Sequence, residues 1–351
     1  MPLLRNPVAM ARQLTQSAAR IAWYAGVARF ADRTVKRPPS EDLRAPSRAV
    51  PARAELLQAI RELALRDARA VGDGLYPMHE GGGTGLAEYA GRIRAMLRDM
   101  PEAAGRRASR QTESAKVVAG SETLPGYYTQ DFHFQDGGHL SPESARLYDV
   151  QVETLFMGSG QLMRRASLGP VSRYLRQHDQ RHASLLDIAC GTGRLLRELG
   201  LAFPRLSLGG IDLSPAYLAE ARRYLGSISR RVRLVEGNAE ALPFSEDSQD
   251  IVTSVFLYHE LPPEVRVRVT SEAARVLKPG GIFVLMDSLQ YGDRPGWDGL
   301  LEVFPERFHE PYFGHYVEDE LGALLARAGL IVEEVELAFM SKVVVGRKPD
   351  G

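Results

Sequence analysis

A strand that breaks into a glycine-rich turn has the clearest chemical meaning in this sequence. The apolar run 184–189 ends in a turn that contains Gly191 and Gly193, and a helical pattern follows. Glycines let the backbone approach a ligand closely, and the first N–H groups of a helix are free to bind it. Asp212 ends the next apolar run, 21 residues after Gly191, where a carboxylate can accept hydrogen bonds from both hydroxyls of a ribose.

Two classes of ligand fit this pattern, and two interpretations without a ligand compete with them. A dinucleotide site reads G-x-G-x-x-G, but Leu196 stands at the third glycine position. That departure disfavours NAD or FAD, whereas a nucleoside without phosphates needs only the close turn and the ribose acid. Without a ligand, Gly191 and Gly193 would only make a tight turn, and Asp212 would cap the helix that begins near Ser214.

The chain resembles the class I S-adenosylmethionine-dependent methyltransferases in motifs that follow the family's order and spacing. The glycine turn is similar to their first motif, and Asp212 follows at the expected distance. Residues 237–244 look like the loop beside the adenine, 247–252 like the entry to the fourth strand, and 275–281 like the turn before the fifth. The pattern is closest to the subgroup that contains the ubiquinone and menaquinone C-methyltransferases, and it covers about residues 150–347.

This resemblance implies S-adenosyl-L-methionine as the cofactor. Asp187 and the two glycines would hold its methionine part, Asp212 its ribose, and Asn238 its adenine edge. Many family members carry Asp in place of Asn238, whose side-chain oxygen can still accept a hydrogen bond from the exocyclic amine. The implied cofactor-binding residues are Asp187, Ala189, Gly191, Thr192, Gly193, Asp212, Leu213, Asn238, Ala239 and Phe256.

A histidine follows the fourth predicted strand. Methyl transfer from a sulfonium is an in-line displacement, so the protein mainly positions the acceptor and excludes water. His259 would lie at the carboxyl edge of the sheet, where ligands bind, and a neutral imidazole can take a proton near pH 7. We therefore predict His259 as a catalytic base; the alternative is a residue at the entry to a helix or on the surface.

Aromatic and imidazole side chains gather in two further segments. The arm 127–148 precedes the first strand, and in the resembled family this part of the chain covers the cofactor. Residues 304–316 lie where relatives place substrate-binding residues, although they can equally form a small separate core. Their rings suit a flat or lipophilic acceptor. The predicted substrate or lid residues are Tyr128, His133, Tyr148, Phe308, His309 and Tyr312.

The sequence predicts no metal site. His309, Glu310 and His315 invite that interpretation, but their spacing fits no helix-borne ligand pattern, and Pro311 interrupts the segment. The single cysteine, Cys190, excludes a multi-cysteine zinc site and an intrachain disulfide. Without an evident charged neighbour to stabilise a thiolate, it is expected to be a packed residue rather than a nucleophile.

The elements that must position these residues follow an alternating rhythm from about residue 170, which indicates βα units around a parallel sheet. We expect an α/β fold: a Rossmann-like, doubly wound, mostly parallel seven-stranded sheet with an N-terminal helical extension. Strands are expected at 184–189, 207–211, 232–236, 250–256, 281–287, 331–338 and 340–346. Helices are expected at 54–70, 86–99, 141–156, 193–202, 215–226, 264–277 and 318–329, with 101–122 as an exposed connection.

The predicted organisation has four parts. Residues 1–37 form a basic amphipathic helix, 38–122 a helical region with linkers, 123–160 the lid arm and its helix, and 161–351 the catalytic domain. The first 37 residues carry seven basic side chains and one acid. Such a helix can pack on the rest of the protein, lie on an anionic membrane surface, or act as a transit peptide.

The composition is that of an ordinary globular protein, with 44% hydrophobic and 25% charged residues among 351. The net charge of zero hides a split, because residues 1–120 hold 20 basic and 12 acidic side chains and the remainder holds 24 and 32. The acidic half would repel a long polyanion, and no aromatic–basic reading motif occurs, so nucleic acid is not expected as a partner. No run approaches the ~20 apolar residues of a membrane span. We expect a cytoplasmic protein, with peripheral membrane contact through 1–37 as an open alternative.

These patterns predict a methyltransferase that moves a methyl group from S-adenosylmethionine to a small, aromatic or lipophilic acceptor. Two alternatives remain at this level. One is a nicotinamide-dependent oxidoreductase on a similar sheet. The other is a non-catalytic cofactor-binding module that docks to a partner through its basic N-terminal arm. The sequence does not name the acceptor, the methylated atom or the oligomeric state.

Overall fold

A computed structural model describes residues 6–34, 45–80, 85–118 and 120–350. In these residues, seven strands form one sheet in the order β3-β2-β1-β4-β5-β7-β6. The strands are β1 (Ser184–Ile188), β2 (Ser207–Asp212), β3 (Val232–Glu236), β4 (Gln249–Val255), β5 (Leu277–Ser288), β6 (Ile331–Ala338) and β7 (Ser341–Arg347). Only β7 runs antiparallel to its neighbours β5 and β6. The predicted α/β fold is confirmed, and the strand order reverses beside β1, the kind of place where ligands bind in open sheets.

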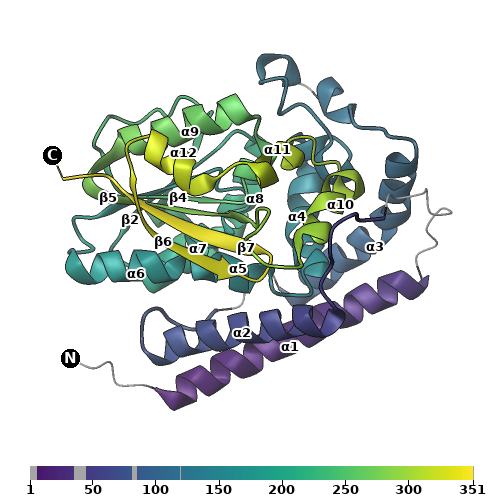
Figure 1. Ribbon diagram of the computed structural model, residues 1–351, viewed down its shortest axis with the longest axis horizontal. Coiled ribbons are helices and arrows are strands. Elements are labelled where there is room, and N and C mark those ends of the chain that lie inside the picture. The colour runs from purple at the N-terminus through teal and green to yellow at the C-terminus, as the bar shows by residue number, and fades with distance from the viewer. Residues whose placement is uncertain (1–5, 35–44, 81–84, 119, 351) are drawn as a thin grey trace.

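Helices cover both faces of the sheet (Figure 1). The helices of the sheet region are α5 (Gly160–Ala166), α6 (Leu168–Gln177), α7 (Arg194–Ala202), α8 (Pro215–Leu225), α9 (Pro263–Val276) and α12 (Leu321–Arg327). Helices α9 and α12 pack together on one face, and α6 and α7 lie on the other. Because both faces are covered, the central strands read as continuous apolar runs; Leu185, Leu186 and Ile188 of β1 are all buried.

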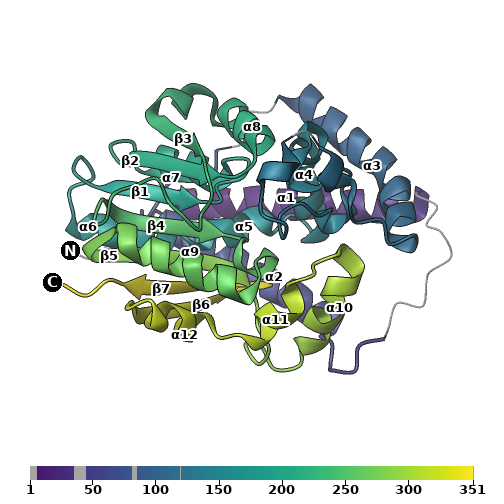
Figure 2. The ribbon, with the colours of Figure 1, turned by 90° about the horizontal axis from the view of Figure 1, so that it is seen from above.

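A second group of helices lies beyond the carboxyl ends of the parallel strands (Figure 2). It comprises α3 (Leu86–Ala108), α4 (Pro142–Leu155), α10 (Asp298–Phe308) and α11 (Phe313–Glu318). Helix α4 begins where the sequence predicts it, because the hydroxyl of Ser141 accepts a hydrogen bond from the backbone N–H of Ser144. These helices enclose the edge of the sheet at which the glycine turn lies.

The N-terminal helices α1 (Pro7–Thr34) and α2 (Arg53–Gly72) lie side by side beneath the sheet region (Figure 1). Tyr24 and Ala31 bury one side of α1, whereas Trp23 and Phe30 are more than half exposed. Packing on the rest of the protein is therefore confirmed for this helix, and contact with a membrane stays a prediction. Within the described residues, none of the helices is long and apolar enough to cross a membrane.

A buried ionic network joins α1 and α2 to the sheet region. Gln13 donates a hydrogen bond to Asp67 (2.5 Å), and Asp67 accepts another from Arg165 of α5 (2.8 Å). Arg165 also pairs with Glu198 of α7, which in turn contacts His79. Each of these side chains is less than a tenth exposed. Removing one member would leave a buried charge unpaired, so the network holds the N-terminal helices in a defined position.

The structure corrects several predicted boundaries. Helix α3 continues to Ala108 through Pro101, so residues 101–108 are not the exposed connection that their polarity suggests, and Ala104 is buried. The expected helix 318–329 is the shorter α12, and α5, α6, α10 and α11 were not predicted. Short helices gain most of their stability from packing against the rest of the fold, which a local pattern does not show.

Candidate active site

The glycine turn after β1 has the left-handed backbone that its sequence suggests. Gly191 and Gly193 have φ values of +53° and +74°. A Cβ on Gly193 would lie 3.1 Å from that of Ala221, whereas one on Gly191 would meet no heavy atom closer than 3.9 Å. Gly193 is therefore required for the close approach of α7 and α8, and Gly191 keeps the backbone beside the cavity open.

Asp212 at the end of β2 joins two turns of the backbone. Its Oδ2 accepts a hydrogen bond from the N–H of Gly191 (2.8 Å), and its Oδ1 accepts one from Ser214 (2.9 Å). Burial raises the pKa of this carboxyl, although the two backbone N–H groups oppose the shift. The cap of α8 is Ser214, whose hydroxyl accepts from the N–H of Tyr217, so Asp212 is not the capping side chain.

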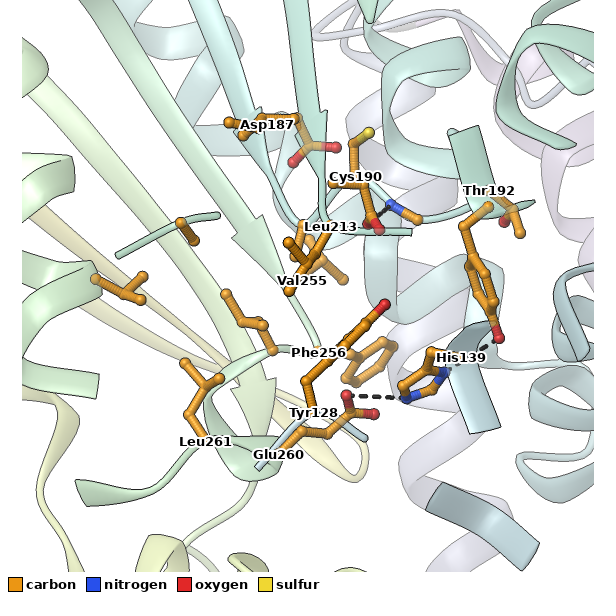
Figure 3. A pocket seen from close by; sticks show the side chains of 18 of the residues that line it. Tyr128, His139, Asp187, Cys190, Thr192, Leu213, Val255, Phe256, Glu260 and Leu261 are labelled. Carbon is orange, nitrogen blue, oxygen red and sulfur yellow. Dashed lines mark hydrogen bonds and ion pairs between the residues drawn. The ribbon is translucent and has the colours of Figure 1, made fainter. Parts of the chain in front are cut away.

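A cavity opens between the ends of β1, β2 and β4 and the arm that precedes β1 (Figure 3). The predicted cofactor residues that line it are Asp187, Ala189, Gly191, Thr192, Asp212, Leu213, Asn238, Ala239 and Phe256, and Tyr128 lines it as well. Gly193 is not among its lining residues; it precedes α7 as the N-cap. This lining fits a nucleoside cofactor with a cationic amino-acid part. It combines a glycine turn, the carboxylate of Asp212 at the end of a strand, and the amide of Asn238 beside small apolar residues.

Two residues of this cavity have contacts that the sequence does not show. The hydroxyl of Thr192 donates a hydrogen bond to Asp149 of α4 (2.9 Å), which ties the glycine turn to the lid helix. Asp187 accepts a hydrogen bond from Thr253 (2.7 Å), and burial raises its pKa to about 7. A cation bound beside Asp187 would favour its ionised form.

A second cavity, of about 190 Å³, adjoins the first and is lined mostly by apolar and aromatic side chains. Tyr148 and Phe256 line both cavities, so the two meet at these rings. The lining residues are His133, Gln135, Tyr148, Gln151, Val152, Leu155, Phe156, Phe256, His259, Ser288, Leu301, Phe304, Phe308, Phe313 and Met340. Among the described residues, the segment 304–316 is thus part of a cavity wall rather than a separate core.

Two predicted substrate residues lie elsewhere. His309 and Tyr312 are not among the described residues that line either cavity. His309 follows α10 with a φ of +48°, and its ring packs against Phe134 with centroids 5.5 Å apart. The hydroxyl of Tyr312 accepts a hydrogen bond from Gln130 (3.0 Å). Both side chains hold the arm against α10 and α11. From the sequence alone, a residue with this packing role cannot be told from one that contacts a substrate.

His259 is buried at the wall of the second cavity, so the alternative of a surface residue is wrong. Its Nδ1 lies 2.6 Å from Oδ1 of Asp287, at the end of β5. Burial opposes the charged form of the ring, but Asp287 outweighs that effect and raises the pKa of His259 to about 10. A ring with this pKa donates hydrogen bonds at neutral pH, and its role as a base stays a prediction.

Imidazole and carboxylate groups meet between the two cavities. Nε2 of His139 lies 3.1 Å from Oε2 of Glu260, as the dashed line in Figure 3 shows. Nε2 of His133 lies 3.6 Å from Oε1 of the same carboxylate. Glu310, which the sequence grouped with His309 and His315, instead lies 3.1 Å from Nδ1 of His133.

Sequence reasoning missed His139, Glu260 and Asp287 as site residues. Asp287 is the last residue but one of β5, at the carboxyl edge of the sheet. A carboxylate at the end of a strand is the signal that pointed to Asp212, and it could have indicated Asp287 as well. His139 lies in the aromatic arm, and Glu260 follows His259 directly, but their mutual contact joins segments 121 residues apart. No local spacing predicts such a pair.

The comparisons agree with this geometry. A family model described as a methyltransferase domain matches residues 185–281, which hold the glycine turn, Asp212 and His259. The ubiquinone/menaquinone biosynthesis C-methyltransferase of Methylobacterium nodulans is 34% identical over 185 residues, which are 52% of this chain and 67% of that protein. A demethylmenaquinone methyltransferase of Listeria welshimeri is 32% identical over 142 residues, 39% of this chain and 57% of its own.

The chain thus spans 57–67% of the length of these relatives. Among solved structures, the pyocyanin biosynthetic protein PhzM is 17% identical, with a TM-score of 0.46 over 83% of this chain and 76% of that one. S-adenosylmethionine is the cofactor of the matched family, and the first cavity fits it. With a relative 34% identical and matched over two thirds of its length, the chain belongs to the class I S-adenosylmethionine-dependent methyltransferases, among which it resembles the ubiquinone/menaquinone C-methyltransferases.

Proposed function

We propose that this methyltransferase acts on a small, flat, apolar molecule that carries a hydroxyl group and binds in the second cavity. The observation that carries this proposal is the junction of the two cavities at Tyr148 and Phe256. A cofactor held by Asp212 and the glycine turn would face an acceptor held among phenylalanine rings. The relatives named for quinone methylation support an aromatic acceptor.

The first cavity holds the cofactor through this chain's own groups. Asp212 would accept hydrogen bonds from the ribose hydroxyls, Asn238 would meet the adenine, and Asp187 would face the amino-acid part. The bound cofactor supplies an activated methyl group on a sulfonium. The wall of the second cavity would hold the acceptor's hydroxyl oxygen toward that methyl group, and the hydroxyl proton would leave to a neighbouring base or to water.

The second cavity selects the acceptor mainly by its apolar wall. Phe156 of the lid region stacks on Phe256 with centroids 6.3 Å apart, and Phe304 packs against Phe308 and Phe313. A few polar groups among such side chains fix the orientation of a ligand. His133 and His259 are the imidazoles of this wall, and they lie next to the junction with the first cavity. They would therefore meet the hydroxyl end of the acceptor.

The arm before β1 would exclude water from the transfer. Tyr127 and Tyr128 line the cofactor cavity, and the hydroxyl of Tyr127 donates a hydrogen bond to Glu240 (2.7 Å). That bond ties the arm to the loop after β3, across the cofactor cavity. Holding both reactants in one orientation in a dry site contributes most of the rate enhancement available to a transfer of this kind.

Filling the second cavity tests the proposal. Transfer of labelled methyl from S-adenosylmethionine is measured with a set of hydroxylated aromatic compounds, for the native chain and for Leu155→Trp at the cavity wall. Leu155 is 38% exposed, so a larger side chain can be accommodated without disturbing the core. Transfer should fall at least about tenfold while the affinity for S-adenosylhomocysteine stays unchanged, because only the acceptor is displaced.

Val267→Trp is the matched control, since Val267 is 45% exposed on α9 and lines neither cavity. Equal transfer by native protein and Leu155→Trp would contradict the assignment of the cavity. Failure of the native chain to methylate any hydroxylated aromatic compound, while it binds the cofactor, would contradict the acceptor class.

A further inference from the structure

We propose that His133, His139 and Glu260 bind one divalent transition-metal ion at the junction of the two cavities. The three side chains come from two segments, the arm before β1 and the short helical turn after β4 (Tyr258–Glu260). Their ligand atoms lie within 4.8 Å of one another. Two histidines and one carboxylate are a recurring ligand set for such ions in proteins.

The separations of these atoms suit a shared ion. Two atoms bound to one ion at about 2.1 Å can be at most about 4.2 Å apart. The carboxylate of Glu260 lies 3.1 Å from Nε2 of His139 and 3.6 Å from Nε2 of His133. A third imidazole, that of His259, places its Nε2 4.0 Å from the same carboxylate. Small movements of these side chains would therefore bring His133, His139 and Glu260 to bonding distance of one ion, with His259 available as a further ligand.

Each of these imidazoles has a polar group beside its other nitrogen, and for His139 and His259 that group is a hydrogen-bond partner. Nδ1 of His133 lies 3.1 Å from Glu310, and Nδ1 of His139 lies 3.2 Å from the hydroxyl of Tyr217. Nδ1 of His259 is held by Asp287. In metal sites, histidine ligands almost always donate their second N–H to such a partner, which fixes the ring and leaves the opposite nitrogen to bind the ion. Here the Nε2 atoms of all three imidazoles face the carboxylate of Glu260.

Glu310 is the independent sign that this cluster lacks a cation. Its side chain is fully buried, and neither carboxylate oxygen has a hydrogen bond partner. Its contacts are His133 and, within 4.8 Å, the ligand atoms of His259 and Glu260. A buried carboxylate without a hydrogen bond is costly, and the imidazole of His133, 3.1 Å away, is the nearest group that can carry positive charge. A divalent ion beside it would compensate the negative charge of the cluster.

The ligand chemistry indicates the class of ion. Imidazole nitrogen suits zinc, iron, cobalt, nickel and copper, whereas magnesium and calcium prefer oxygen ligands alone. The cluster borders the first cavity, here called the cofactor cavity, through His139 and Glu260. It borders the second cavity, here called the acceptor cavity, through His133. Three protein ligands leave coordination positions open, and we place the acceptor's hydroxyl oxygen at one of them. This last step rests on the proposed function above.

Cobalt binding to the full chain tests the site without any acceptor. Protein treated with a chelator is titrated with Co²⁺ while visible absorption and heat are recorded. We expect one ion per chain at micromolar concentration, with d–d bands of a nitrogen- and oxygen-ligated ion. His133→Ala and His139→Ala should each weaken binding at least about tenfold. His315→Ala is the control, because His315 is exposed and lies outside both clusters among the described residues.

Because His139 and Glu260 line the cofactor cavity, circular dichroism and the thermal unfolding midpoint, measured in parallel, show whether each variant is folded. Glu260→Gln provides a further variant that keeps the size of the side chain and removes its charge; it should weaken cobalt binding. The proposal is overturned if the native protein binds S-adenosylhomocysteine but no stoichiometric cobalt. It is also overturned if the two histidine variants bind cobalt as the native protein does, in which case the imidazoles pair with Glu260 as cations. Loss of aromatic transfer with intact cobalt binding would instead contradict only the proposed acceptor.

Discussion

The cofactor cavity and the acceptor cavity adjoin each other, yet they are built in different ways. The first uses backbone turns and the ends of neighbouring parallel strands, and its carboxylate Asp212 is tied to the backbone of Gly191 and Ser214. The second uses side chains from the arm before β1, from α4, α10 and α11, from the end of β5 and from the segments after β4 and β6. The shape of the cofactor cavity is set by the backbone of the fold itself. The specificity of the acceptor cavity depends on its side chains, so substitutions there can change it without changing the sheet.

The largest expected effect concerns the cofactor cavity. Asp212→Ala removes the acceptor of two ribose hydrogen bonds, each worth about 1.5 kcal/mol to a charged group. The dissociation constant of S-adenosylhomocysteine, measured by calorimetry, should rise about 100-fold. Asp247→Ala, an exposed carboxylate outside the cavity, should leave that constant unchanged. An unaltered affinity in a folded Asp212→Ala protein would show that the ribose binds elsewhere.

The acceptor cavity should respond separately. Phe304→Ala removes one ring from its wall, and the loss of buried apolar contact should raise the acceptor's KM about tenfold. The affinity for S-adenosylhomocysteine should stay at the native value, because Phe304 does not line the cofactor cavity. Steady-state kinetics with a hydroxylated aromatic compound that the native protein methylates would measure this change. A matching loss of cofactor affinity would mean that the two cavities are not independent.

The smallest effect is a pH dependence of cofactor binding. Asp187 has a pKa of about 7 in the free protein because it is buried. Binding of the cofactor's ammonium group favours the ionised carboxylate, so protonation below pH 7 should weaken binding. Affinity should fall about threefold from pH 7.5 to pH 6.5, as isothermal calorimetry can show. Asp187→Asn should flatten this profile, and a profile unchanged by that substitution would assign the titration to another group.

Much of the fold and of the cofactor cavity was predictable from local patterns. Apolar runs of five to seven residues between helical patterns indicated the parallel strands β1 to β4, and Ser141 and Ser214 marked the starts of α4 and α8 correctly. The boundaries that failed, such as the end of α3 beyond Pro101, depend on burial against distant segments. Local composition does not contain that information.

Local patterns also fail to predict which single residues line the second cavity. His133, Tyr148 and Phe308 line the second cavity, whereas His309 and Tyr312, also an imidazole and an aromatic ring, contact the arm instead. The contact of His139 with Glu260 joins two segments that only the folded chain brings together. Side-chain direction in such loops is decided by packing, which spacing along the chain does not encode.

The sequence by itself determined the glycine turn, the carboxylate at the end of β2 and the α/β class, because each depends on neighbours within one βα unit and on backbone conformations that few residues allow. Only the tertiary structure decided where His133, His139, Glu260 and Asp287 meet. Their convergence needs the arm, the turn after β4 and the end of β5 to lie side by side. Such long-range contacts form when apolar surfaces are buried across the whole chain.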